Sequence, residues 1–112
     1  MTREEVEAAA LALPAATKVV QWGGADVYKV GGKVFAICGL ASGLSFKVTE
    51  IGFMVLTDDG PGRQAPYLAK GHWVLVDLDD LDSGEAAGWL KTSHELISAK
   101  LTRKLKAELG LV

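Results

Sequence analysis

Cysteine is almost absent from this chain, and its scarcity excludes one large class of protein. The 112 residues include a single cysteine, Cys38, so no internal disulfide can form and a disulfide-stapled secreted scaffold is ruled out. No apolar run approaches the roughly 20 residues that a membrane-spanning helix needs. The opening residues, Met-Thr-Arg-Glu-Glu, lack the basic-then-apolar order of a secretory signal. We therefore expect a cytoplasmic protein without a membrane partner.

An excess of basic charge is also missing. Twelve Lys and Arg residues stand against fourteen Asp and Glu residues, which gives a formal net charge of −2. Proteins that coat DNA without sequence preference are normally basic, because contacts with phosphate supply their affinity. Any role with nucleic acid would therefore need a local basic patch on a mildly acidic body.

Signatures of catalysis and of metal binding are absent as well. No serine lies in a G-x-S-x-G elbow, no Cys or His pair has the spacing of zinc ligands, and Gly31-Gly32-Lys33 is not a P-loop. The acidic run 77–82 lacks the glycine and the final glutamate of a calcium loop. We interpret Cys38 as a small core residue and His94 as a core or boundary histidine. We expect no enzyme activity and no cofactor, unless folding brings His72, His94, Cys38 and the aspartates together in a cleft.

What the chain does contain is enough apolar sequence for one packed domain over residues 1–112, since 49% of its residues are hydrophobic. Thr2-x-x-Glu5 has the form of a capping box, so a first helix is predicted to begin there and to close before Pro14. A long last helix is predicted from Asp82 to Gly110. Its apolar stripe is formed by Leu90, Ile97, Leu101, Leu105 and Leu109.

Between these helices the pattern indicates strands. Residues 26–30 and 33–37 flank Gly31-Gly32, which is typical of a two-residue hairpin turn. The simplest register places Tyr28 opposite Phe35 and Val30 opposite Lys33. It follows that Tyr28, Val30, Phe35 and Ile37 should share one face, covered by helices.

Two more strands and a short helix complete the expected order. Residues 44–48 alternate, with Leu44, Phe46 and Val48 pointing inward. Thr49 is expected to cap a short helix that packs through Ile51, Met54 and Val55, and residues 72–78 form another strand. The prediction is an α+β fold, in which an antiparallel sheet carries the N- and C-terminal helices on one face.

Basic and aromatic residues recur in the second half of the chain. Lys100, Arg103 and Lys104 would lie on one side of the last helix, and Lys47 projects from the polar side of a strand. Lys70 and His72 flank a strand near Tyr67 and Trp73, an arrangement that can grip phosphates and stack on bases. Two plainer interpretations stay open. The helix cations could simply complement the helix dipole, and the aromatics could edge the core.

Several stretches resemble the MmcQ/YjbR family. They are Tyr28-Lys29-Val30-Gly31-Gly32-Lys33-Val34-Phe35-Ala36, Leu44-Ser45-Phe46-Lys47-Val48, and Pro66-Tyr67-Leu68-Ala69-Lys70-Gly71-His72-Trp73-Val74, with Trp22-Gly23 and Ser93-His94-Glu95-Leu96 also fitting. The family more often has Leu at position 46 and Tyr at position 94. The resemblance implies a compact bacterial α+β domain of frataxin-like topology, and it carries the family's label of DNA-binding protein with a double-wing arrangement. The matching polar or aromatic residues are Lys29, Lys47, Tyr67, Lys70, His72 and Trp73.

The sequence therefore favours two functions. The first is a monomeric DNA-binding or regulatory module that contacts phosphate through Lys47, Lys70, His72 and the face formed by residues 100–104. The second is a non-catalytic module that binds a small anionic ligand or a protein partner at the same residues. Frataxin-like topology also suggests iron binding, but the first helix lacks repeated surface carboxylates.

Overall fold

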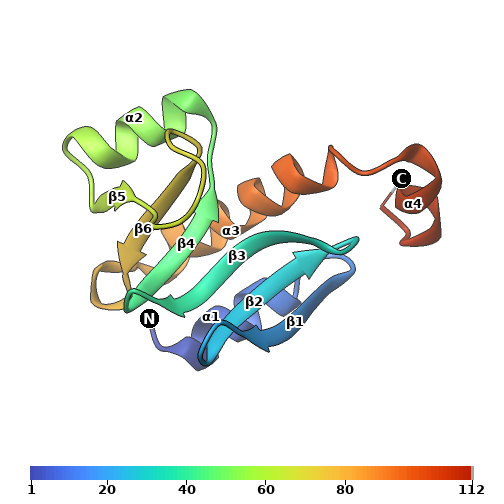
Figure 1. Cartoon of the computed structure of the whole chain (residues 1–112), viewed down its shortest axis with the longest axis horizontal. Coiled ribbons are helices and arrows are strands. Elements are labelled where there is room, and N and C mark those ends of the chain that lie inside the picture. The colour runs from blue at the N-terminus through green and yellow to red at the C-terminus, as the bar shows by residue number, and fades with distance from the viewer. Residues whose placement is uncertain (112) are drawn as a thin grey trace.

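The computed structural model describes residues 1–111, which form a two-layer arrangement of sheet and helices (Figure 1). The strands form one antiparallel six-stranded sheet in the order β1-β2-β3-β4-β6-β5. The strands are β1 (Ala16–Gln21), β2 (Ala25–Val30), β3 (Lys33–Leu40), β4 (Gly43–Lys47), β5 (Gly62–Gln64) and β6 (Trp73–Asp77). The helices are α1 (Arg3–Leu11), α2 (Glu50–Asp58), α3 (Ser83–Ser98) and α4 (Arg103–Glu108), with a 3-10 turn at Leu78–Asp80.

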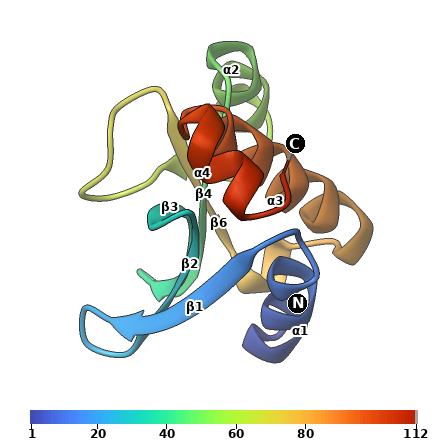
Figure 2. The same ribbon diagram turned by 90° about the vertical axis from the view of Figure 1, so that its right-hand side faces the viewer.

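The predicted fold class is confirmed. Figure 2 shows α1 and α3 together on one side of the sheet, while the loop between β5 and β6 projects on the other side. We call the side without helices the open face. Within residues 1–111 no helix is both long and apolar enough to cross a membrane.

The helix starts follow their predicted caps. The Thr2 hydroxyl accepts a hydrogen bond from the Glu5 N–H, and the Glu5 carboxylate accepts one from the Thr2 N–H, which completes the capping box. The Thr49 hydroxyl accepts from the Gly52 N–H, and the Asp82 carboxylate accepts from the Glu85 N–H. Each of these side chains satisfies an amide that has no partner inside its helix.

The central hairpin turns at Gly31-Gly32 as predicted, but its register is not the simple one. Val30 pairs with Lys33 and Lys29 with Val34, and then a bulge shifts the pairing so that Tyr28 lies opposite Ala36. Phe35 is the extra residue of the bulge. The prediction that Ile37 shares a face with Tyr28 is therefore wrong, because one added residue turns every later side chain of β3 to the other face.

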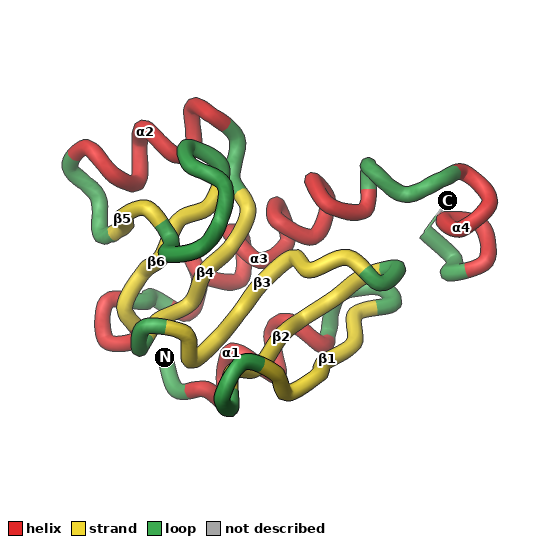
Figure 3. Tube along the Cα trace, viewed as in Figure 1, coloured by secondary structure: helices red, strands yellow, loops and turns green. Residues whose placement is uncertain are grey.

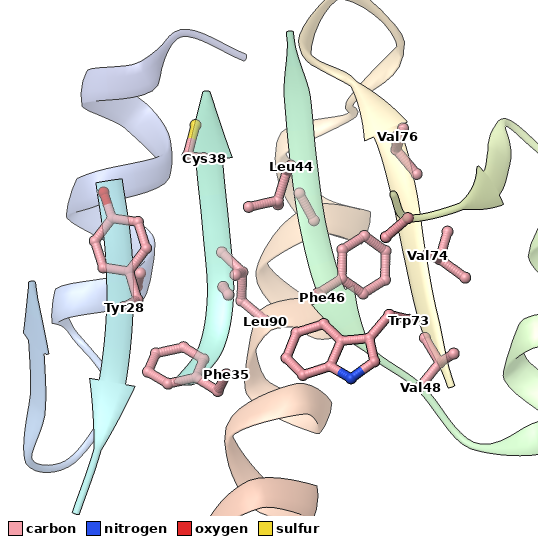
Figure 4. Close-up of a cluster of buried hydrophobic side chains, with 14 of the residues drawn as sticks. Tyr28, Phe35, Cys38, Leu44, Phe46, Val48, Trp73, Val74, Val76 and Leu90 are labelled. Carbon is pink, nitrogen blue, oxygen red and sulfur yellow. The ribbon is translucent and has the colours of Figure 1, made fainter. Parts of the chain in front are cut away.

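The core between sheet and helices is built from the large side chains on the helix-covered face. Tyr28, Phe35, Leu44, Phe46 and Leu90 are all fully buried in it (Figure 4). Ile37 instead joins Ala25 and Val27 in a small apolar cluster on the open face.

Ser93 is the polar connection between α3 and the sheet. Its buried hydroxyl donates to the Phe35 carbonyl (2.5 Å) and accepts from the Lys47 N–H (2.8 Å). The last ladder pair of β3 and β4 on this side is Ala36 with Phe46, so Phe35 and Lys47 would form the next pair. The serine occupies that place, and it satisfies two backbone groups that the bulge leaves without strand partners.

Two local expectations are corrected around α2. Its apolar residues Ile51, Met54 and Val55 do not pack inward, and Ile51 is 75% exposed; Leu56 is the buried residue of the helix. Residues 58–62 after it are typical of a turn that leads into a loop, yet they lead into the short edge strand β5. The predicted strand over 72–78 is observed as β6, and residues 78–80 turn into the 3-10 helix.

Candidate nucleic-acid interface

Lysine and arginine side chains gather where β4 ends and α3 finishes. Lys47 is the last residue of β4, and Lys100 follows the end of α3. The turn of the central hairpin lies beside them, because a Cβ added to Gly31 would stand 2.6 Å from Leu101 Cδ1. We call the set Lys33, Lys47, Lys100, Arg103 and Lys104 the basic end.

The last helix is not continuous, contrary to the prediction. It ends at Ser98, and Thr102 starts α4 by accepting a hydrogen bond from the Leu105 N–H (Figure 3). Lys100 thus lies in a link, and Arg103 and Lys104 lie in the first turn of α4. Cations there oppose the helix dipole, so dipole complementation does not explain them. Lys106, in the last turn, does fit that explanation.

The ammonium groups of Lys47 and Lys100 lie close together. Partial burial lowers the pKa of Lys47, and the positive charge of Lys100 lowers it further. Among residues 1–111 the ion pairs are Arg3–Asp26, Lys18–Glu7 and Arg63–Asp77, and none of them involves the basic end. Lys100 therefore disfavours the charge on Lys47, and no ion pair among the described residues offsets that repulsion.

Acidic residues are concentrated at the opposite end of α3. Residues 77–85 hold five carboxylates and no cation, and they run from the end of β6 into the first turn of α3. Residues 27–49, by contrast, hold three lysines and no carboxylate. The net charge of −2 thus conceals a separation of charge along the molecule, and a local basic patch exists on an acidic body.

The remaining predicted site residues lie in different places. Tyr67 and Lys70 are exposed on the loop between β5 and β6, His72 is half-buried at its end, and Lys29 is half-buried on β2. Trp73 is only 8% exposed and belongs to the core, so it cannot offer a ring for stacking. The structure brings Lys47 together with Lys100 and leaves Trp73 outside the surface.

Sequence reasoning did not select Trp22 as a site residue, although it is 57% exposed in the turn between β1 and β2. Its exposure could have been inferred from the sequence, because Trp22 stands between a strand and Gly23-Gly24, where a side chain is difficult to bury.

The groups weighed for catalysis have structural partners. The Nε2–H of His94 points at the Pro14 carbonyl oxygen (2.7 Å), and its ring lies edge-on to Phe35. Burial raises the pKa of the Cys38 thiol to about 11, which keeps it protonated and unreactive at neutral pH. Within residues 1–111 no three His, Cys, Asp or Glu side chains are grouped to hold a metal ion.

The fold and the basic end define a class: a small two-layer α+β domain with one helix-covered sheet face and one open face. Residues 11–96 match the YjbR family model, and the chain belongs to the YjbR family. The crystal structure of Deinococcus radiodurans protein DR2400, described as a DUF419 domain, is similar, with 25% identity and a TM-score of 0.88 over 99% of this chain and 89% of the other. No curated protein matches the chain.

If Lys47 serves binding rather than folding, its charge is expected to lower the stability of the folded state. Its pKa is lowered in the folded state, so the charged form costs stability in full at pH values below that lowered pKa. The cost then decreases as the pH rises from the lowered pKa to the ordinary lysine pKa. We expect Lys47→Met to raise the melting temperature at neutral pH, by an amount that shrinks at alkaline pH. Lys91→Met, on the exposed surface of α3, is the control and should leave the melting temperature unchanged. A loss of stability in Lys47→Met would make Lys47 a structural residue.

Proposed function

We propose that this domain is a non-catalytic module that binds nucleic acid by placing phosphates at the basic end. The observation that carries the proposal is the close approach of Lys47 and Lys100 with no carboxylate partner. Holding two ammonium groups together is unfavourable until an anion lies between them. A phosphate there would relieve the repulsion and raise the pKa of Lys47 toward its ordinary value.

The neighbouring cations extend this surface beyond a single anion. Arg103 and Lys104 are exposed in the first turn of α4, and Lys33 is exposed beside the hairpin turn. Together with Lys47 and Lys100 they come from β3, β4, α4 and the link before α4, which suits a chain of phosphates better than one small anion. The separation of charge would orient the domain, since the acidic end is repelled by the same polyanion.

A binding role rather than a catalytic one agrees with the contacts of the candidate catalytic groups. His94 is held by Pro14 and Phe35, and the Cys38 thiol is buried. Neither group lies among the residues of the basic end.

The test is fluorescence anisotropy of a labelled mixed-sequence duplex at low salt, comparing wild type with Lys47→Gln/Lys100→Gln. Loss of two phosphate contacts should weaken binding about five- to tenfold or more. Lys91→Gln removes the same kind of charge from α3 and should bind like the wild type. If the double variant and the control bind equally, the basic end is not the contact surface. If inorganic pyrophosphate displaces the duplex at low millimolar concentration, a small anionic ligand becomes the better assignment.

A further inference from the structure

The open face of the sheet carries a hollow that the basic end does not include. It has a volume of about 380 Å³ and is lined by Trp22, Ile37, Leu40, Tyr67 and Leu68. Its lining residues come from the turn before β2, from β3 and from the loop between β5 and β6. Figure 2 shows that turn and that loop on the side of the sheet away from α1 and α3. Its size falls in the range of small-ligand sites, and its lining is aliphatic and aromatic.

Two strained aromatic residues form the walls. Trp22 has a φ of 50° and Tyr67 a φ of 66°, which is the left-handed region that bulky residues rarely occupy. Such residues persist only when something else requires them, and they concentrate at functional sites. Burial does not compensate here, because Trp22 is 57% exposed and Tyr67 94% exposed.

A polar side chain fixes each wall in place. Arg3 donates from Nη2 to the Gly24 carbonyl (2.8 Å), which ties the turn that carries Trp22 to α1. Gln64 donates to the carbonyls of Ala65 (2.7 Å) and Leu68 (3.2 Å) and accepts from the Gly71 N–H (2.9 Å), so it closes the loop that carries Tyr67. The backbone that carries each aromatic residue is thus held in place before any ligand binds, which lowers the entropy lost on binding.

A buried hydroxyl lies beside the floor. Ser45 is the cross-strand partner of Ile37, so both side chains point to the open face. Its hydroxyl is fully buried and has no hydrogen-bond partner within residues 1–111. A polar group without a partner is costly in the interior.

The charges on the open face and on the loop that carries Tyr67 favour an anionic occupant with a flat apolar part. Lys70 lies three residues beyond Tyr67 on the same loop, and Lys29 lies on the open-face side of β2, two positions from Val27. Asp77, the carboxylate that the strand register places on this face, is already paired with Arg63. A nucleotide joins a flat ring to a phosphate, so its ring would suit the apolar hollow and its phosphate would suit the lysines.

Building on the proposed nucleic-acid function, we infer that Trp22 and Tyr67 hold an unpaired base of a single strand, with Lys70 and Lys29 near its phosphates. In a duplex the faces of the bases are stacked on one another and cannot enter the hollow. Stacking on aromatic side chains tolerates every base, so the site selects single strands rather than a sequence.

The test compares a labelled oligothymidylate of about 12 nucleotides with an abasic strand of equal length. The wild type should bind the strand with bases more tightly than the abasic strand. Tyr67→Gly should reduce the ratio of the two affinities by about 5- to 100-fold. Glycine also relieves the left-handed backbone at position 67, so the melting temperature should stay the same or rise, which separates lost stacking from lost folding. Tyr67→Phe keeps the ring and should bind like the wild type. Met54→Ala, on the exposed face of α2, is a control for loss of apolar surface.

Each outcome separates the two proposals. If the abasic strand and the oligothymidylate bind equally and both weaken with salt, the basic end binds phosphate and the hollow does not hold a base. If neither strand nor the mixed-sequence duplex binds at low salt, the nucleic-acid function itself fails. If free nucleosides quench tryptophan fluorescence while neither strand binds, the hollow is a small-molecule site and the inference is overturned.

Discussion

Replacing Ser93 with alanine is expected to lower the free energy of unfolding by about 3 kcal/mol, because it leaves two buried backbone groups without partners. The Phe35 carbonyl and the Lys47 N–H both depend on the Ser93 hydroxyl, and Ser93 is fully buried. The cost of an unmade hydrogen bond is larger than the net benefit of a made one, so each orphaned group contributes separately. Urea unfolding followed by circular dichroism measures the change, with an unaltered denaturant slope showing that the folded state is kept.

Ser45→Ala is the matched control, since it makes the same change at another fully buried serine. The Ser45 hydroxyl has no partner within the described chain, so its removal should leave stability unchanged or slightly higher. Equal losses in the two variants would mean that loss of side-chain volume, rather than loss of hydrogen bonds, determines the cost. The two hydrogen bonds of Ser93 would then contribute little to the free energy of unfolding.

Gly43→Ala is the second change with a large expected effect, a loss of about 3 kcal/mol or more. Gly43 begins β4 between Leu40 of β3 and Asp77 of β6. An added Cβ would lie 2.6 Å from the Val76 carbonyl oxygen and 2.6 Å from Leu75 Cδ1. The backbone oxygen cannot move aside without breaking the pairing of β4 with β6, so the clash is not relieved by a side-chain rotation.

Gly88→Ala provides the control for that substitution. Gly88 lies within α3, and a Cβ there meets nothing within 4 Å. Alanine should therefore raise the stability by about 0.5–1 kcal/mol through the lower entropy of the unfolded chain. A thermal shift assay on the two variants should give changes of opposite sign. A mild effect of Gly43→Ala would show that β4 and β6 are not as tightly apposed as the register requires.

The sequence predicted features that are decided within a few residues of each other. The caps at Thr2, Thr49 and Asp82 each involve a side chain and an amide three residues later, so the pattern alone identifies them. The Gly31-Gly32 turn is likewise local. Fold class followed from these elements and from the short connections between them.

Features that depend on distant contacts were not predictable. The bulge at Phe35 is completed by Ser93, 58 residues away, and nothing in the strand pattern marks it. Leucines at a spacing of four continue through residue 109, so periodicity could not show that Thr102 restarts the helix. The same break moved Lys100, Arg103 and Lys104 from one predicted helix face to a link and a new helix start.

The candidate site divides in the same manner. Lys47, Tyr67 and Lys70 were identified from the recurring basic and aromatic residues and from the family resemblance. Trp22 and the hollow it shares with Tyr67 required the fold, because the β1–β2 turn and the β5–β6 loop are far apart in the chain. Trp73 was chosen for its residue type, and its burial excludes it from the surface.

The salt dependence of duplex binding tests the central claim most directly. If Lys47, Lys100, Arg103 and Lys104 contact phosphates, a plot of log affinity against log salt should have a slope of about −3 to −4. Lys47→Gln/Lys100→Gln should reduce the magnitude of that slope by about 2, because two released counterions are lost, and Lys91→Gln should leave it unchanged. Binding that does not weaken with salt, or a slope that the double variant does not alter, would contradict the assignment of the basic end as the phosphate-binding surface.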